Sequence, residues 1–291
     1  KSVNMKITDI FKQQSRTFSF EFFPPKDEIS AVDFGINVGQ LMKLNPSFVS
    51  VTYGAGGSSQ ERTFALVGYL QQKIGLQTMA HYTCVGASKE KIIADMQLIQ
   101  TMGIENLMLL RGDPPQGAAT FEPHPGGFAY ASELVTFIRS AGFDFCIGGG
   151  AYPEKHPEAG SMPQDIANLK KKTDAGASFL LTQLFFDNAG YFRFVEQCRA
   201  AGIGCRIIPG ILPITSFSQW KRFSMISNMP EALNEKIKSC EGNPKKAYQT
   251  GLDFAIAQCR ELLSKGAPGL HFYTLNKSRA TVEIFETITG C

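Results

Sequence analysis

Eight strand-like runs that alternate with helix-like runs predict a closed (β/α)8 barrel, a TIM barrel, for this chain of 291 residues. The sequence contains no short turn between two alternating runs, which would be the sign of an antiparallel hairpin. Its length suits one barrel. Polar and small residues follow each predicted strand, where barrels bind their ligands. After strands one to eight these residues are Glu21, Thr52-Tyr53-Gly54, His81, Arg111-Gly112-Asp113, the run 148–152, Gln183, Pro209-Gly210 and Tyr273-Thr274.

The first predicted strand places a carboxylate at its C-terminal end. From Phe18 to Phe22 every second residue is Phe, so one face of the strand is aromatic and the face that carries Glu21 is polar. Pro24 and Pro25 end the strand because neither can donate to a sheet. In a barrel the Phe side chains pack outward under helices and Glu21 points into the mouth. The alternative is an edge strand with Glu21 in solvent.

The remaining elements follow in regular alternation. Strands are expected at 48–53, 78–85, 107–110, 145–148, 179–184, 206–209 and 270–275. Helices are expected at 27–44, 62–74, 89–102, 131–141, 163–175 and 191–201, in two stretches between 216 and 265, and up to about 288. No linker or shift in composition divides the chain, so we expect one catalytic domain over residues 1–291.

Bulk composition excludes several classes of function. The net charge of +3, from 29 basic and 26 acidic residues, gives no signature of nucleic-acid binding. No run approaches the roughly 18 apolar residues of a membrane span, and the N-terminus lacks a secretory core. The seven scattered cysteines form no C-x-x-C pair, as in cytosolic proteins with reduced thiols. We therefore expect a cytoplasmic protein with neither nucleic-acid nor membrane partners.

A glycine-rich run at 54–59 follows the second strand but does not match the dinucleotide fingerprint. Ser59 replaces the third glycine of G-x-G-x-x-G, and no acidic residue follows at the distance that would hold a ribose. The glycines either let the backbone approach a ligand or form a tight turn. Arg111 and Asp113 either meet a phosphate or polar heterocycle, or form a salt bridge at the barrel rim.

Other polar residues give weaker signals. On the helix that begins at Pro163, the residues Asp165, Asn168 and Lys172 share one face, which is solvated by default. The four histidines lack paired metal-ligand spacing, so no metal is expected. No G-x-S-x-G elbow supports a serine hydrolase.

Seven segments together resemble one family, the methylenetetrahydrofolate reductases, in its bacterial-type catalytic barrel. They are SFEFFPPK (19–26), VTYGAGG (51–57), LRGDPP (110–115), AYPEKHPEA (151–159), LTQLFFD (181–187), PGILPI (209–214) and HFYTLN (271–276), in family order. The resemblance implies a barrel that holds FAD without a Rossmann motif. It also implies that the C-terminal regulatory region of eukaryotic relatives is absent.

By position, the resemblance assigns one set of residues to FAD and another to the substrates. The FAD set is Tyr53, Ala55, His81, Arg111, Gly112, Asp113, Ala131, Tyr152, His156, Ala159, Asp165, Asn168, Lys171 and Lys172. Thr52 and Gln183 would meet NADH or NADPH, and Gln183, Gln219 and Asp113 the folate. Phe223 would stack on whichever substrate is bound. Lys277 stands where bacterial relatives carry Arg, so it keeps the charge toward the folate tail but loses the bidentate fork.

The reaction that the resemblance implies proceeds in two half-reactions. NADH or NADPH reduces FAD and leaves, and 5,10-methylenetetrahydrofolate then accepts the hydride to give 5-methyltetrahydrofolate. Glu21 would be the general acid at N10, with a raised pKa, and Asp113 would stabilise the cation. The rivals are a flavin- or pterin-binding barrel that needs an external electron donor, and a proline-dehydrogenase-like flavoenzyme. A homo-oligomer is expected.

Overall fold

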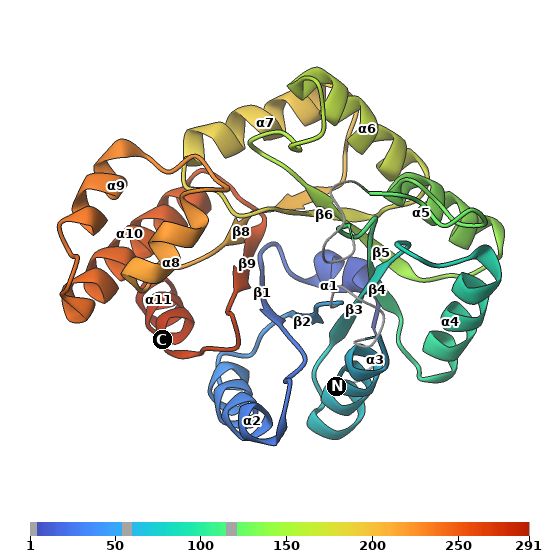
Figure 1. Cartoon of the computed structure of the whole chain (residues 1–291), viewed down its shortest axis with the longest axis horizontal. Helices are drawn as coiled ribbons and strands as arrows, with labels where there is room; N and C mark the ends of the chain where they lie inside the picture. The colour runs from blue at the N-terminus through green and yellow to red at the C-terminus, as the bar shows by residue number, and fades with distance from the viewer. Residues whose placement is uncertain (1–4, 54–59, 115–120, 291) are drawn as a thin grey trace.

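The computed structural model describes residues 5–53, 60–114 and 121–290, and its strands form one parallel sheet that closes into a barrel (Figure 1). The strand order is β7-β6-β5-β4-β3-β2-β1-β9-β8. The strands are β1 (Thr17–Phe22), β2 (Phe48–Val51), β3 (Thr78–Thr83), β4 (Asn106–Leu110), β5 (Cys146–Ala151), β6 (Phe179–Thr182), β7 (Arg206–Ile208), β8 (Gly210–Ile211) and β9 (Gly269–Tyr273).

The barrel has eight strand positions although nine strands are assigned. β7 pairs with β6 and β8 pairs with β9, and only Pro209 separates β7 from β8. Proline has no N–H to donate to the sheet, but its carbonyl accepts from the N–H of His271 at 2.9 Å. β7 and β8 therefore together form the seventh strand of the barrel, which runs two residues beyond the predicted end at Pro209, and the predicted (β/α)8 barrel is confirmed.

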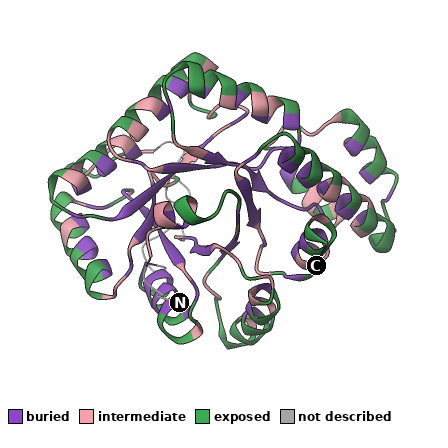
Figure 2. Ribbon diagram, turned by 180° about the vertical axis from the view of Figure 1, so that it is seen from behind, coloured by how far each residue is buried: buried purple, intermediate pink, exposed green. Residues whose placement is uncertain are grey.

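Helices surround the barrel and are buried only on the sides that face it (Figure 2). They are α2 (Glu28–Met42), α3 (Gln60–Tyr69) with the π-helical turn η1 (Leu70–Ile74), α4 (Lys89–Thr101), α5 (Ala131–Ser140), α6 (Met162–Asp174), α7 (Asn188–Ala200), α8 (Phe217–Phe223), α9 (Glu231–Lys238), α10 (Pro244–Ser264) and α11 (Arg279–Thr289). The region between 216 and 265 thus holds three helices, where the sequence predicted two. No helix in the described ranges is long and apolar enough to cross a membrane.

The aromatic face of β1 packs outward as predicted. Phe20 and Phe22 are buried in the layer between the sheet and the helices, where Phe22 packs edge-on against Phe34 of α2 and Phe20 against Phe285 of α11. The alternation of the strand therefore turns Glu21 to the barrel interior.

A short helix that the sequence did not predict, α1 (Ile7–Gln13), lies across one end of the barrel. Its Ile7 and Ile10 pack with Phe48 and Phe179 inside the barrel. Asn106 of β4 accepts from the N–H of Ile7 at 2.8 Å and fixes the start of the helix. This plug closes the N-terminal ends of the strands, so ligands reach the interior from the opposite end.

Candidate active site

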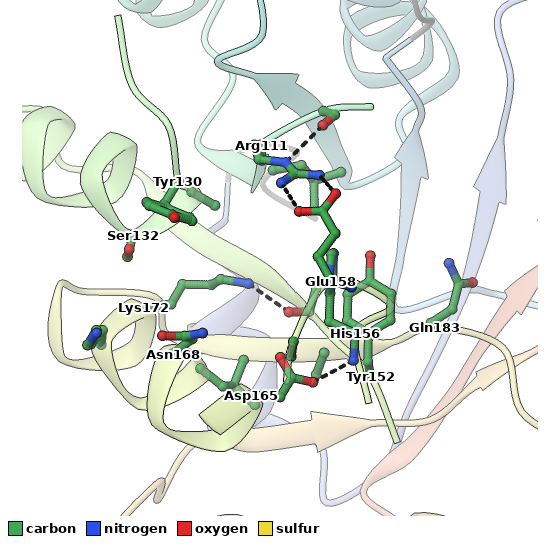
Figure 3. Close-up of a pocket in the computed structure, with 18 of the residues that line it drawn as sticks. Arg111, Tyr130, Ser132, Tyr152, His156, Glu158, Asp165, Asn168, Lys172 and Gln183 are labelled. Atoms are coloured by element: carbon green, nitrogen blue, oxygen red, sulfur yellow. Dashed lines mark hydrogen bonds and ion pairs between the residues drawn. The ribbon is translucent and has the colours of Figure 1, made fainter. Parts of the chain in front are cut away.

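A cavity of about 690 Å³ opens at the C-terminal ends of β4 and β5, between the loop that follows β5 and the face of α6 (Figure 3). Its volume lies within the usual range for cofactor and small-molecule sites. The walls come from the end of β4, the loop 150–159, α6, the start of α5, and Gln183 after β6. This is the end of the barrel where the sequence predicted ligand binding.

α6 presents one polar face to the cavity. Ser161 caps the helix by accepting from the N–H of Gln164, and Ile166 on another face is buried. Asp165, Asn168 and Lys172 share the predicted face and line the cavity, so this face is not the solvated surface expected by default.

Lys172 brings a partly buried cation to the cavity wall. Its Nζ donates to the carbonyl of Gly150 at 2.8 Å. A Cβ on Gly149 would lie 2.7 Å from Lys172 Cδ, so glycine at this position lets the lysine stem cross β5. Burial lowers the pKa of Lys172 to about 8, against the opposing effect of Asp165. A bound anion would stabilise the charged form of this ammonium, which burial disfavours.

Arg111 forms an ion pair with Glu158 at the cavity rim. Its two terminal nitrogens donate to the two carboxylate oxygens at 2.5 and 2.7 Å, and its guanidinium lies 4.5 Å from the centre of the Phe121 ring. Arg111 thus forms a rim salt bridge, but its partner is Glu158 and not the Asp113 considered from the sequence. Glu158 is more than half exposed, so an incoming anion can reach Arg111 by displacing it.

Tyr152 and His156 form the side of the cavity that faces α6. Their ring centres are 4.6 Å apart and the rings meet edge to face. The Asp165 carboxylate accepts from the N–H of His156 at 2.8 Å and ties the loop to α6. Burial lowers the pKa of His156, so its imidazole is neutral near pH 7.

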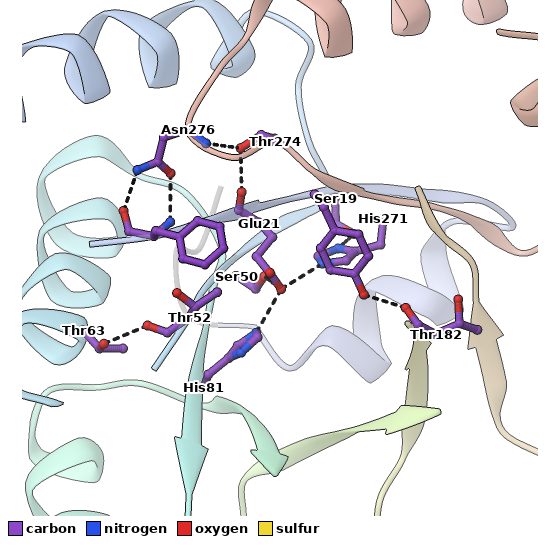
Figure 4. A network of polar contacts seen from close by, with 12 residues as sticks. Ser19, Glu21, Ser50, Thr52, Thr63, His81, Thr182, His271, Thr274 and Asn276 are labelled. Atoms are coloured by element: carbon purple, nitrogen blue, oxygen red, sulfur yellow. Dashed lines mark hydrogen bonds and ion pairs between the residues drawn. The ribbon is translucent and has the colours of Figure 1, made fainter. Parts of the chain in front are cut away.

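Glu21 lies deeper, in a polar cluster within the barrel (Figure 4). Its side chain is 9% exposed, and one oxygen, Oε2, faces three groups. Ser50 Oγ is 3.4 Å away, His81 Nε2 3.3 Å and His271 Nε2 3.5 Å. His271 Nδ1 in turn lies 2.8 Å from Ser19 Oγ.

The charge state of Glu21 differs from the sequence-based expectation. Burial raises the pKa of Glu21. The hydrogen bond with His271, the charges of His81 and His271, and the hydrogen bond with Ser50 together lower it by more, so the net pKa is below its ordinary value. The role of general acid that the resemblance implies for Glu21 carried the prediction of a raised pKa. That prediction was wrong, because the groups around the carboxylate are histidines.

Two of the buried polar atoms that lack a hydrogen-bond partner in the described ranges belong to the cluster around Glu21 in Figure 4. They are His81 Nε2, which is near Glu21 but outside hydrogen-bond geometry, and Thr52 Oγ1. Buried polar groups are nearly always satisfied in native proteins. Because these two atoms have no partner in the part of the chain that the structure describes, they can form hydrogen bonds with a polar ligand that enters the barrel from the cavity.

Most residues assigned to FAD by position line the 690 Å³ cavity. They are Tyr53, Arg111, Gly112, Asp113, Ala131, Tyr152, His156, Ala159, Asp165, Asn168, Lys171 and Lys172. His81 is instead buried beside Glu21, and Ala55 lies outside the described residues.

The residues assigned to the substrates are more dispersed. Gln183 lines the cavity, whereas Thr52 is buried and its carbonyl accepts from Thr63. Gln219 Oε1 accepts from the N–H and the hydroxyl of Thr215. Phe223 is buried in an apolar cluster beside α9, and Lys277 is exposed.

Among the lining residues that sequence reasoning missed are four that stand beside an assigned residue. They are Tyr130, Ser132, Glu158 and Gln164. Tyr130 and Ser132 flank Ala131, and Tyr130 is 60% exposed at the rim, labelled in Figure 3. The signal available in the sequence was their place directly beside residues already assigned to the site.

The family model for methylenetetrahydrofolate reductase matches residues 6–289 of the chain. The chain belongs to the methylenetetrahydrofolate reductase family. It is 35% identical to the 5,10-methylenetetrahydrofolate reductase of Escherichia coli K12, over 99% of this chain and 95% of that protein. It is 38% identical to methylenetetrahydrofolate reductase (NADH) 1 of Arabidopsis thaliana, over 96% of this chain and 49% of that protein.

The family resemblance inferred from the seven segments is thus confirmed, and the chain spans about half the length of the plant relatives it matches. A solved structure of an uncharacterized protein from Clostridium thermocellum, described as binding two copies of 5-methyl-5,6,7,8-tetrahydrofolic acid, has the same fold. It superposes with a TM-score of 0.68 at 14% identity and covers 97% of each chain.

Proposed function

We propose that this member of the family reduces 5,10-methylenetetrahydrofolate to 5-methyltetrahydrofolate with NADH or NADPH, through bound FAD, in the cytoplasm. The observation that carries the proposal is the juxtaposition of a cation-bearing cavity, lined by Lys172 and Arg111, with a buried carboxylate, Glu21, inside the same barrel mouth. Family membership gives the reaction its identity, because relatives across 96–99% of the chain carry that name.

The cavity residues fit FAD. Lys172 is a partly buried cation with one carbonyl partner among the described residues, as a site for a pyrophosphate requires. The Arg111 guanidinium lies at the same rim, and Tyr152 and His156 provide flat surfaces beside it. When bound, FAD supplies the hydride transfer, and the protein supplies orientation, charge and exclusion of water.

Glu21 holds the proton for N10 of the folate in this proposal. Because its pKa is lowered in the free protein, Glu21 is a carboxylate at neutral pH and must first receive a proton. His271 Nε2 lies in hydrogen-bond contact with Oε2 at 3.5 Å and is the neighbour placed to pass a proton to Glu21, whereas burial lowers the pKa of His81. Asp113 lies at the cavity wall, where its charge would stabilise a cationic folate.

An absorption spectrum tests the cofactor assignment most simply. The purified or FAD-reconstituted protein should show flavin bands that bleach when NADH or NADPH is added without oxygen. A protein that takes up no FAD would contradict the proposal. Bands that ignore both nucleotides but bleach with dithionite would favour a barrel that depends on an external electron donor.

Lys172→Ala should weaken FAD binding by roughly 10- to 100-fold, because a charge-assisted contact contributes about 1.5–3 kcal/mol. Titration of the apoprotein by flavin fluorescence measures this. The matched control is Lys170→Ala on the same helix, which removes a lysine that pairs with Asp174 outside the cavity. Equal FAD affinity in both variants would show that Lys172 on the α6 face does not contact FAD.

The same lysine gives FAD binding a pH dependence. The pKa of Lys172 is lowered to about 8, so its charge is lost as the pH rises through that value in the free protein. A bound anion raises the pKa of the ammonium again, so FAD affinity should fall with rising pH from about 8 upward. Lys172→Met should remove this slope, and a slope that persists in Lys172→Met would assign it to another group.

A further inference from the structure

A tight turn follows β9 at residues 274–277 and has an unfavourable backbone. The N–H of Lys277 donates to the carbonyl of Thr274 at 2.9 Å and closes the turn. Its two central residues, Leu275 and Asn276, have φ of 49° and 58°. Turns with positive φ at both central positions favour Asn and Gly, and leucine is disfavoured there.

The turn brings Asn276 against the end of β1, where its side chain makes two hydrogen bonds to one residue. Oδ1 accepts from the N–H of Phe23 at 2.8 Å, and Nδ2 donates to the carbonyl of Phe23 at 2.8 Å. Thr274 Oγ1 donates to the carbonyl of Glu21 at 2.7 Å and accepts from the N–H of Asn276 at 3.1 Å. Figure 4 shows these bonds on one side of Glu21.

This arrangement replaces sheet pairing where the sheet ends. The register between β1 and β9 stops at Glu21 and Tyr273, and the prolines at 24 and 25 have no N–H to pair. The Asn276 amide pairs with both backbone groups of Phe23, as a neighbouring strand would. The backbone is thereby fixed both at Glu21 and two residues beyond it.

We infer that Asn276 is a positioning residue for the Glu21 carboxylate. The inference rests on the proposed role of Glu21 as the acid. Asn276 is absent from the described cavity linings, so it acts through the β1 backbone rather than on a ligand. A displacement of about 1 Å at a catalytic group can cost about 10²-fold in rate.

The test measures the two half-reactions of the FAD-loaded protein separately by stopped-flow absorbance. Asn276→Ala removes both side-chain bonds, and Asn276→Gly removes them while keeping a residue that accepts positive φ. Both variants should slow reoxidation of the reduced flavin by 5,10-methylenetetrahydrofolate about 10- to 100-fold. Reduction by NADH or NADPH should stay within about threefold of wild type, because it needs no proton from Glu21.

Asn188→Ala is the matched control for lost hydrogen bonds. Asn188 also makes two side-chain hydrogen bonds, both donated by Nδ2 to Gln258 and Glu261, and packs α7 against α10 outside the described cavity linings. It should leave the ratio of the two half-reactions unchanged. Folate reoxidation within threefold of wild type in both Asn276 variants, or an equal fall in both half-reactions, would overturn the inference.

A double variant separates this inference from the function it rests on. If Asn276 acts through Glu21, then Glu21→Gln/Asn276→Ala should be no slower in the folate half-reaction than Glu21→Gln alone. If the rate losses of the two single variants multiply in the double variant, the positioning role is overturned. If Glu21→Gln itself keeps the folate step, the acid assignment fails and the inference fails with it, whereas loss in Glu21→Gln but not in the Asn276 variants rejects the inference alone.

Discussion

Glu21→Gln should slow the folate half-reaction by about 10²–10⁴-fold, the usual loss when a general acid is removed. Glutamine keeps the shape of the side chain and can still bond to Ser50 and His271, but it cannot deliver a proton. Reduction of the flavin by NADH or NADPH should persist, since that step protonates no folate nitrogen. Stopped-flow absorbance of each half-reaction measures the split.

FAD content equal to wild type is required before the rates of this variant are compared, because Glu21 belongs to the same barrel that carries the cavity. A loss shared equally by both half-reactions would indicate that Glu21 only supports the fold. Folate turnover within a few-fold of wild type would exclude Glu21 as the acid and pass that role to Asp113 or to water.

Gly251→Ala should lower the free energy of unfolding by about 3 kcal/mol, although alanine is the better helix former. Gly251 lies inside α10, and a Cβ there would be 1.5 Å from the carbonyl oxygen of Ile214. The backbone of α10 therefore rests directly on the segment between β8 and α8. The midpoint temperature of thermal unfolding should fall by roughly 5–10 °C for a chain of this size.

Gly39→Ala on α2 is the matched control. A Cβ at Gly39 would meet nothing within 4 Å, so helix propensity alone should raise the free energy of unfolding by about 0.5–1 kcal/mol. Opposite signs for the two glycines would support the close packing of α10. Equal stabilisation by both substitutions would contradict it.

Local patterns predicted the barrel, whereas the residues that line the cavity were assigned through the family resemblance. The alternation in β1 predicted that Glu21 faces inward, and helical spacing predicted the shared face of Asp165, Asn168 and Lys172. Both predictions need only the period of one element. The helix α1 was missed because it is one short amphipathic segment whose partners, such as Phe48 and Phe179, lie on distant strands.

The electrostatics of the site depended on contacts that no local pattern encodes. The pKa of Glu21 is lowered mainly by His271, which is 250 residues away in the chain. Phe223, which the resemblance assigns to the substrate face, packs in an apolar cluster with Leu212 and Ile237. Such pairings follow from barrel register and loop packing, which a sequence-based reading of single elements does not contain.

The most direct test of the proposed function is a sequential anaerobic experiment on the FAD-loaded protein. NADH or NADPH is added first, and 5,10-methylenetetrahydrofolate second, with flavin absorbance and the folate product both recorded. The proposal predicts bleaching, then return of the oxidised bands with one equivalent of 5-methyltetrahydrofolate per flavin. Flavin that stays reduced after the folate is added, or that recovers without this product, would contradict it.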